Sequence, residues 1–410
     1  MRSGPRSGIV IALTASLATA LPAQVPEARA LHDRVSAVLA GRETDLIELR
    51  RDLHRHPELS GAEVRTAGIV AARLQALGFE VRTGVGGHGV VGVLRGGRPG
   101  RLVAYRADMD AMPSDAPDPV EFRSLTPGVR HICGHDLHVA VGLAIAEGLA
   151  AVRRDLPGSV MLIFQPAEEN ASGARAMLAD GVFAAATPDA IYAVHTAPLP
   201  VGWLGTTPGG LMAGRDVARV TLTGSGDLAA AADSVGHLIE RLGTLAPAAQ
   251  FQAPPDGFIL IQGVRRGPAP GGALLVGVQL AVASEESRTR ARDGALRIAA
   301  ALRLPGVRVE ATYEAKVVAG VTNDADLVSR ASAGIRAALG DSAVIDVGTA
   351  PPAFSEDFGS YQDQVPGVMY FLGVGPAGMP HTPGYVADEA AILVGAKAMT
   401  AVILARLAQG

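Results

Sequence analysis

The chain has 410 residues, which is more than one hydrophobic core usually serves, so two domains are expected. Hydrophobic residues make up 48% and charged residues 19%, a globular composition that excludes an intrinsically disordered protein. The formal net charge is -4, and lysine and arginine are scattered along the chain, which argues against a nucleic-acid-binding protein.

The N-terminus has the pattern of a signal peptide. Arg2 and Arg6 precede an apolar stretch at 9–20 that is too short to span a bilayer comfortably. We therefore expect residues 1–23 to be removed and the protein to be exported, to the periplasm or outside the cell, with no membrane segment left after cleavage. The alternative is a buried or fraying N-terminal helix. Cys133 is the only cysteine, so no internal disulfide can form.

Helical and strand patterns alternate in the first half of the chain. Helices are predicted at 28–53 (one or two), 63–77, 138–153 and 173–179, and strands at 79–82, 89–94, 102–105, 159–164 and 190–194. The strands at 159–164 and 190–194 are wholly apolar, as in sheets covered on both faces. This alternation predicts an α/β domain with a mostly parallel sheet.

From about residue 215 the pattern changes to the order β-α-β-β-α-β. The strands are predicted at 217–223, 257–264, 274–282 and 307–313, and the helices at 228–242 and 287–302. This order fits a split βαβ domain of the α+β class, about a hundred residues long. A strand at 368–373 and a helix at 387–407 then return to the first pattern. We therefore expect a catalytic domain in two parts, 24–214 and 319–410, with the small domain 215–318 inserted.

Metal-binding residue types gather in one short segment. His131, Cys133, His135 and His138 lie within eight residues, after a loop and before a helix. Sulfur and imidazole nitrogen together are ligands that transition metals accept. Taken alone, the segment is equally well explained as a buried thiol near surface histidines.

Further candidate ligands follow the apolar strands. Glu168 and Glu169 come just after the strand 159–164, and two adjacent carboxylates repel unless cations or different roles separate them. His195 follows the next apolar strand, and His381 follows the strand 368–373. Because open α/β sheets place their ligands beyond the carboxyl ends of the strands, we expect these segments to converge on a metal site.

These stretches together resemble the M20 metallopeptidases, in the amidohydrolase branch that includes hippurate hydrolases and auxin-conjugate hydrolases. The resemblance covers nearly the whole chain after the leader. The matching stretches are 49–60, 105–113, 131–138, 164–169, His195 with Pro198 and Gly202, 355–358, and 373–389 with His381.

The resemblance implies a two-metal amidohydrolase. Two divalent cations, zinc or manganese first and cobalt or nickel next, would be held by Cys133, His135, Glu169, His195 and His381, with Cys133 bridging them. Glu168 would be the general base and acid, while Asp108 and Asp110 would orient the site from behind the ligands. The substrate would be a small N-acyl amino acid or a short peptide, and the inserted domain would act as a lid that often forms a homodimer.

The inserted domain departs from the family pattern. Asp227 stands where the family usually has a histidine that stabilises the oxyanion, and neither the usual asparagine (around 268–273) nor the usual arginine (around 281–284) is found. A different substrate, slower hydrolysis, or an exported metal-containing binding protein with weak or no hydrolase activity would each fit. Asp227 could also be a turn residue without a role in catalysis. A structural zinc module is disfavoured, because its ligands would come from four distant segments beside an unused Glu168.

Overall fold

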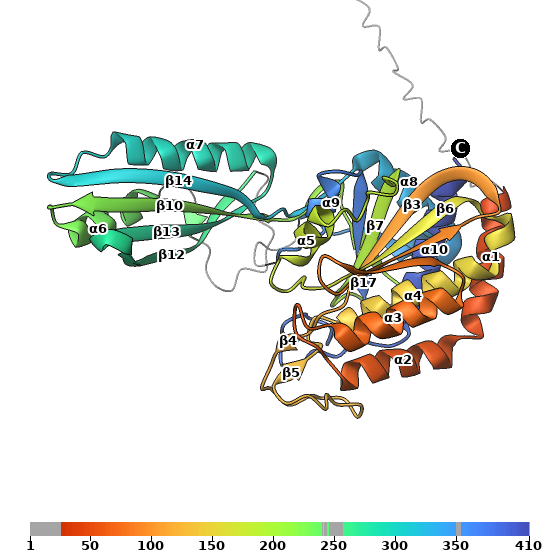
Figure 1. The fold of residues 1–410 in the computed structure, drawn as a ribbon. Coiled ribbons are helices and arrows are strands. Elements are labelled where there is room, and N and C mark those ends of the chain that lie inside the picture. Colours follow the sequence, from red (N-terminus) through yellow and green to blue (C-terminus); the bar gives the residue numbers. More distant parts are fainter. Residues whose placement is uncertain (1–25, 240, 242–243, 246–256, 350–353, 410) are drawn as a thin grey trace, which may run out of the picture.

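The computed structural model describes residues 26–239, 241, 244–245, 257–349 and 354–409. It has a large α/β body and a smaller domain that extends away from it (Figure 1). Residues 1–23 lie outside the described residues, so the signal peptide stays a prediction that N-terminal sequencing of the exported protein would test. In the described part of the chain, no helix combines the length and the apolar character needed to cross a membrane.

The body is built on an eight-stranded sheet. The strands lie in the order β1 (Glu80–Val85), β2 (Gly89–Arg95), β6 (Pro157–Gln165), β3 (Arg98–Asp108), β7 (Ala190–Ala197), β17 (Gly367–Gly373), β8 (Leu204–Thr206) and β16 (Val344–Asp346). The four central strands, from β6 to β17, run parallel. The pairs β1–β2, β2–β6 and β17–β8 are antiparallel. The carboxyl ends of the four parallel strands therefore meet at one edge of the sheet.

Helices cover both faces of this sheet, which explains its apolar strands. The larger core includes residues from α1 (Pro26–Ala40), α2 (Glu43–Arg55), α3 (Val64–Ala76), α4 (His135–Ala151), α8 (Ala325–Leu339) and α10 (Ala391–Leu407). The opposite face packs against α5 (Gly173–Ala179) and α9 (Gly359–Gln362). Along β3 the side chains alternate, so that Val103 and Tyr105 enter the first core and Ala104 enters the second.

The smaller domain has its own five-stranded sheet. It is formed by β10 (Gly214–Gly224), α6 (Leu228–Ile239), β11 (Thr244–Leu245), β12 (Ile259–Ala269), β13 (Ala273–Val282), α7 (Glu285–Ala301) and β14 (Val307–Val318). The strand order is β11-β12-β13-β10-β14, and every pair except β11–β12 is antiparallel. Ala218, Val220 and Leu222 of β10 share one apolar core with residues of α6 and α7. We refer to this domain as the lid.

The predicted architecture, a mostly parallel α/β body with a separate split βαβ domain, is confirmed. The boundaries predicted at 214 and 318 fall at the start of β10 and the end of β14. Two differences matter for the site. The strand expected to end at residue 194 continues to Ala197, so His195 lies inside β7 and not beyond it. The helix expected from residue 138 already begins at His135.

Several short strands had no counterpart among the predictions. Two of the unpredicted pairs lie outside the main sheets, namely β4 (Met112–Pro113) with β5 (Val129–Arg130) and β9 (Gly209–Met212) with β15 (Val321–Asn323). They have between two and four residues each, which is too few to show a hydrophobic period. The pair β4–β5 leads the chain into the segment that contains Cys133.

A buried carboxylate joins the elements at the base of the lid. Asp216 of β10 is fully buried and accepts hydrogen bonds from Arg288 Nε at 3.0 Å, Tyr313 Oη at 2.7 Å and the Lys316 backbone N–H at 2.8 Å. Arg288 comes from α7, and the other two donors come from β14. Since a buried charge is tolerated only when it is paired and hydrogen-bonded, Arg288 should be essential to the stability of the lid.

Replacing Arg288 with methionine removes the cation that pairs with Asp216. We expect the free energy of unfolding of the lid to fall by about 3 kcal/mol, since breaking a buried pair leaves an uncompensated charge. Differential scanning calorimetry would show this as an earlier unfolding transition. The control is Arg292→Met on the same helix, where the arginine is half exposed and pairs with its neighbour Asp293; it should shift stability by less than about 0.5 kcal/mol. Equal effects of the two changes would contradict the account.

Candidate metal centre

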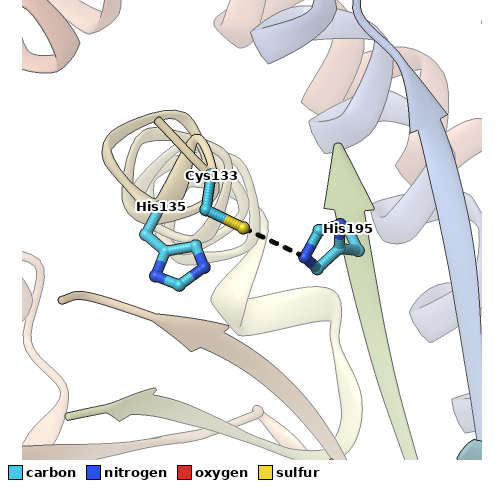
Figure 2. Close-up of side chains that lie close together, drawn as sticks. All are labelled: Cys133, His135 and His195. Carbon is cyan, nitrogen blue, oxygen red and sulfur yellow. Dashed lines mark hydrogen bonds between the residues drawn. The ribbon is translucent and has the colours of Figure 1, made fainter. Parts of the chain in front are cut away.

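Cys133 and His135 flank Gly134, a position where any other residue would be strained. Gly134 is the N-cap of α4 and has φ of 94°, and a Cβ there would lie 2.0 Å from Tyr385 Oη. This tight start of α4 places the Cys133 Sγ atom 3.4 Å from His195 Nε2 of β7 (Figure 2). His135, in the first helical turn, points toward the same space.

Glu169 lies between two further predicted ligands, His135 and His381. Its Oε1 atom lies 3.7 Å from His135 Nε2, and its Oε2 atom lies 3.3 Å from His381 Nε2. His381 has φ of 61°, and its backbone N–H donates to the Ile132 carbonyl at 2.8 Å. The side chain of His381 is 48% exposed, so this residue stands at the open side of the site.

The five predicted ligands form two groups that share one atom. Donor atoms of Cys133, His135 and His195 lie within 4.8 Å of one another, as do those of Cys133, Glu169 and His381. Ligand atoms bound to one zinc-like ion at about 2.0–2.3 Å are separated by roughly 3.3–3.8 Å at tetrahedral angles. One separation within each group matches that spacing: 3.4 Å between Cys133 Sγ and His195 Nε2, and 3.3 Å between Glu169 Oε2 and His381 Nε2. The shared thiol is what a pair of bridged cations would require.

The hydrogen bonding of the ligands also fits a metal site. His135 Nε2 and Glu169 Oε1 are buried and have no hydrogen-bond partner among the described residues, and they face each other. The other ring nitrogen of His135 is held by Asp110 Oδ1 at 3.2 Å, and that of His195 by the Thr196 carbonyl at 2.9 Å. Each imidazole therefore keeps its Nε2 atom for a ligand, as metal-binding histidines do.

The buried carboxylates of the site favour the protonated forms of Cys133 and His135. Burial raises the pKa of the Cys133 thiol, and the carboxylates of Glu169 and Glu168 raise it further. Although burial opposes a charged imidazole, Asp108, Asp110 and Glu169 raise the pKa of His135 to about 10. Without a cation both groups would hold their protons. Divalent cations would compensate for these carboxylates and displace those protons, since metal ligands must be deprotonated.

Asp108 and Asp110 both lie next to the predicted ligand His135, and their role in orienting the site stays a prediction. Asp110 Oδ2 accepts hydrogen bonds from Ser60 Oγ at 2.6 Å and from the Glu169 backbone N–H at 3.0 Å, so Asp110 contacts two predicted ligands. Asp108 Oδ1 pairs with His138 Nδ1 at 2.6 Å.

Two histidines of the 131–138 segment stand outside the ligand set. His138 Nε2 accepts the Thr196 backbone N–H at 2.9 Å and its Nδ1 pairs with Asp108, so both ring nitrogens are engaged. His138 therefore orients Asp108 and leaves no nitrogen for a metal. His131 is buried, and burial lowers its pKa to about 4. Neither ring nitrogen of His131 has a hydrogen-bond partner in the part of the chain that the structure describes.

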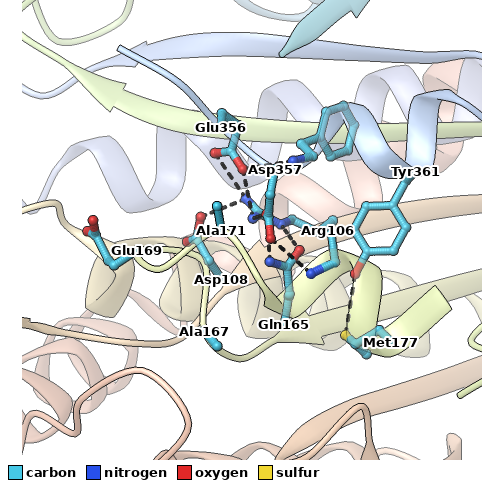
Figure 3. Close-up of polar contacts among 12 residues, drawn as sticks. Arg106, Asp108, Gln165, Ala167, Glu169, Ala171, Met177, Glu356, Asp357 and Tyr361 are labelled. Atoms are coloured by element: carbon cyan, nitrogen blue, oxygen red, sulfur yellow. Dashed lines mark hydrogen bonds and ion pairs between the residues drawn. The ribbon is translucent and has the colours of Figure 1, made fainter. Parts of the chain in front are cut away.

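A buried arginine network forms the inner wall of the site (Figure 3). Arg106 donates to Asp108 at 2.6 Å, to Glu356 at 2.9 Å, to Asp357 at 3.1 Å and to Gln165 at 2.9 Å. The resemblance included 355–358 and 105–113 but assigned no role to Arg106, Glu356 or Asp357. No local signal in the sequence could have found this network, because its members are joined only by the fold.

Glu168 lies between this network and the ligands. It is 7% exposed, and its carboxylate oxygens lie within 4.8 Å of those of Glu356 and Asp357 on one side and of the His135–Glu169 pair on the other. Burial, followed by the charges of Glu356 and Glu169, raises the pKa of Glu168 well above its usual range. A buried carboxyl of this kind, placed beside the ligands, is suited to accept and return a proton.

Asp227, the residue in place of the usual lid histidine, has a structural role. It is exposed, and its Oδ1 atom accepts hydrogen bonds from the backbone N–H groups of Ala229 and Ala230 at 3.1 and 3.0 Å. These contacts make it the N-cap of α6, a position that aspartate favours. Its presence is thus explained by the helix that follows.

Comparisons with known proteins point to one peptidase family. The model of "Peptidase family M20/M25/M40" matches residues 104–405. A probable hydrolase of Synechocystis is 36% identical, over 85% of this chain and 92% of its own length. An N-acetylcysteine deacetylase of Bacillus subtilis is 31% identical, over 86% and 94%. The crystal structure of a Bacillus subtilis protein described as a dinuclear metal binding peptidase of family M20 has a TM-score of 0.76 at 30% identity and covers 90% of this chain and 99% of that one.

Replacing Asp110 with asparagine tests whether Asp110 supports the predicted ligands His135 and Glu169. The amide removes the charge that orients His135, so we expect affinity for divalent cations to fall by about 10- to 100-fold. Competition with a chromophoric chelator would measure this. Asp52→Asn, at a half-exposed position paired with Arg65, serves as the control and should leave the affinity unchanged. An unchanged affinity in the Asp110 variant would show that Asp110 does not support the ligands.

Proposed function

The chain belongs to peptidase family M20/M25/M40, and from that membership we propose that it uses two bound cations to hydrolyse the amide bond of a small N-acyl amino acid or short peptide. The observation that carries the proposal is the position of Glu168. Five donor groups converge on one space, and Glu168 lies beside them as an additional carboxyl, within reach of His135 and Glu169. A closed structural metal site has no use for such a group.

The similarity to the N-acetylcysteine deacetylase supports an N-acyl amino acid as the substrate class. A deacetylase of this kind cleaves an amide between an acyl group and an amino nitrogen. The same bond type occurs in a short peptide, so the proposal covers both. The lid differs from the family pattern at Asp227, which is occupied with capping α6, so the oxyanion would have to be stabilised by other groups.

The residues that would hold the cations are Cys133, His135, Glu169, His195 and His381. When bound, divalent cations supply Lewis acidity toward the scissile carbonyl and acidify a water molecule. A set that mixes thiolate, imidazole and carboxylate suits zinc or manganese, and also cobalt or nickel. Burial lowers the pKa of His195 to about 3, so its imidazole is neutral and keeps a lone pair on Nε2.

Glu168 carries the proton through the reaction. It takes a proton from water as the water oxygen attacks the carbonyl carbon. The carbon–nitrogen bond then breaks, and Glu168 returns that proton to the leaving nitrogen. The products are a carboxylic acid and a free amine. Arg106, through Glu356 and Asp357, holds the wall behind Glu168 and shields it from bulk water.

Replacing Glu168 with glutamine tests this role, because the amide keeps the volume but cannot accept the proton. We expect kcat to fall by about 100- to 10,000-fold, with the cation content and the melting temperature unchanged. The assay is release of free amino acid from a panel of N-acyl amino acids and dipeptides by cation-loaded protein.

The exposed Glu48, replaced by glutamine, is the matched control and should keep full activity. Absence of turnover across the panel by the fully loaded parent chain would contradict the proposed function. A Glu168 variant as fast as the parent chain would contradict the role given to Glu168. Binding of these compounds without turnover would indicate a binding protein.

A further inference from the structure

We propose that Glu63 is a positioning residue for Glu168, because its carboxylate holds the backbone of Ala167 and thereby sets the direction of the neighbouring Glu168 side chain. The inference rests on the proposed function, in which Glu168 moves the proton. Glu63 belongs to none of the candidate ligand groups found among the described residues. Its contribution would therefore be made by holding other residues in place and not by binding a cation.

Glu63 joins two distant segments of the chain. It is fully buried at the N-cap position of α3, and its Oε1 atom accepts hydrogen bonds from the backbone N–H groups of Gly61 and Ala167, both at 2.8 Å. Gly61 belongs to the turn before α3, whereas Ala167 lies 104 residues after Glu63, in the loop after β6. The carboxylate thus connects this turn to the residue that precedes Glu168.

The loop after β6 needs such support because its backbone is strained. Ala167 and Ala171 have φ of 54° and 56°, in the left-handed region that costs a non-glycine residue about 1–2 kcal/mol. The Ala167 carbonyl accepts hydrogen bonds from the N–H groups of Ser172 and Gly173 at 3.3 and 3.0 Å. Glu63 holds the N–H side of the same residue. Because both of its polar groups are hydrogen-bonded, the backbone of Ala167 is held in this conformation, which restricts the direction in which the Glu168 side chain leaves the loop.

The turn that carries Glu63 supports the site in a second place. Ser60 Oγ donates to Asp110 Oδ2 at 2.6 Å, and the same oxygen accepts the Glu169 backbone N–H. Glu58, in contrast, accepts the N–H groups of Arg65 and Thr66 at 2.8 Å and so caps α3 without touching the loop. Glu58 and Glu63 therefore hold the same turn, but only Glu63 reaches the loop that contains Glu168.

The role of Glu63 depends on its acceptor and does not require its charge. Its Oε2 atom is buried and has no hydrogen-bond partner within the described ranges. Burial also raises the pKa of Glu63, which favours the neutral carboxyl. Glutamine keeps an oxygen at the position of Oε1, while methionine has a similar length and no such acceptor. Comparing these two substitutions therefore distinguishes the effect of the hydrogen bond from the effect of side-chain volume.

The experiment compares Glu63→Met, Glu63→Gln and Glu58→Ala in the full chain loaded with cations. For Glu63→Met we expect kcat to fall by about 100-fold, because small misplacement of a catalytic group has effects of this size, while KM and the cation content per chain stay as in the parent. Glu63→Gln should recover most of kcat. Glu58→Ala should lower the melting temperature through loss of the cap and leave kcat unchanged. Initial rates, elemental analysis and thermal unfolding supply the three readouts.

The outcomes distinguish a failure of the role of Glu63 from a failure of the proposed hydrolase function. A parent chain without turnover would overturn the proposed function. An active parent chain with equal kcat in the methionine and glutamine variants would overturn the role of Glu63 alone. The same holds if kcat falls in proportion to cation content, since Glu63 would then act on the ligands. Should the methionine variant not fold, Glu63→Asp, whose carboxylate is one methylene shorter, must be slower than Glu63→Gln.

Discussion

The site depends on the burial of many negative groups in one place. Six carboxylates line it, and they are Asp108, Asp110, Glu168, Glu169, Glu356 and Asp357. On the inner wall, the Arg106 guanidinium compensates for part of this negative charge, since it donates hydrogen bonds to Asp108, Glu356 and Asp357. On the side of the Cys133 thiol, the described residues bring the imidazoles of His135 and His195 beside the carboxylate of Glu169. Since buried charge must be compensated, divalent cations are the natural partners of this side.

The fold assembles these groups from segments far apart in the chain. The parallel strands β6, β3, β7 and β17 bring their carboxyl ends to one edge, and the left-handed Gly134 starts α4 at the same place. Behind the ligands, Asp110 and the Thr196 carbonyl fix the imidazoles of His135 and His195. The site therefore exists only in the folded chain, and its geometry depends on the turns around it as much as on the ligands.

Much of this could be predicted from the sequence, where patterns were local. The alternation of strands and helices predicted the fold class. The polar segments next to apolar strands predicted that Cys133, His135, Glu169, His195 and His381 converge, and the structure brings them together. Their roles as ligands stay predictions. His195 was expected beyond its strand, yet it lies within β7 because pairing with β17 extends to Ala197. The roles of Arg106, Glu356 and Glu63 could not be predicted, since they depend on contacts between residues about a hundred or more positions apart.

The central claim is that the five donor groups would hold two cations, with the Cys133 thiol common to both groups. Diffraction from crystals of the zinc- or manganese-loaded protein, recorded on both sides of the absorption edge of the metal, tests it most directly. The account predicts two anomalous peaks, both within bonding distance of Cys133 Sγ, one on the side of His195 and the other on the side of His381. A single peak, or two peaks that leave the sulfur without a metal neighbour, would contradict it.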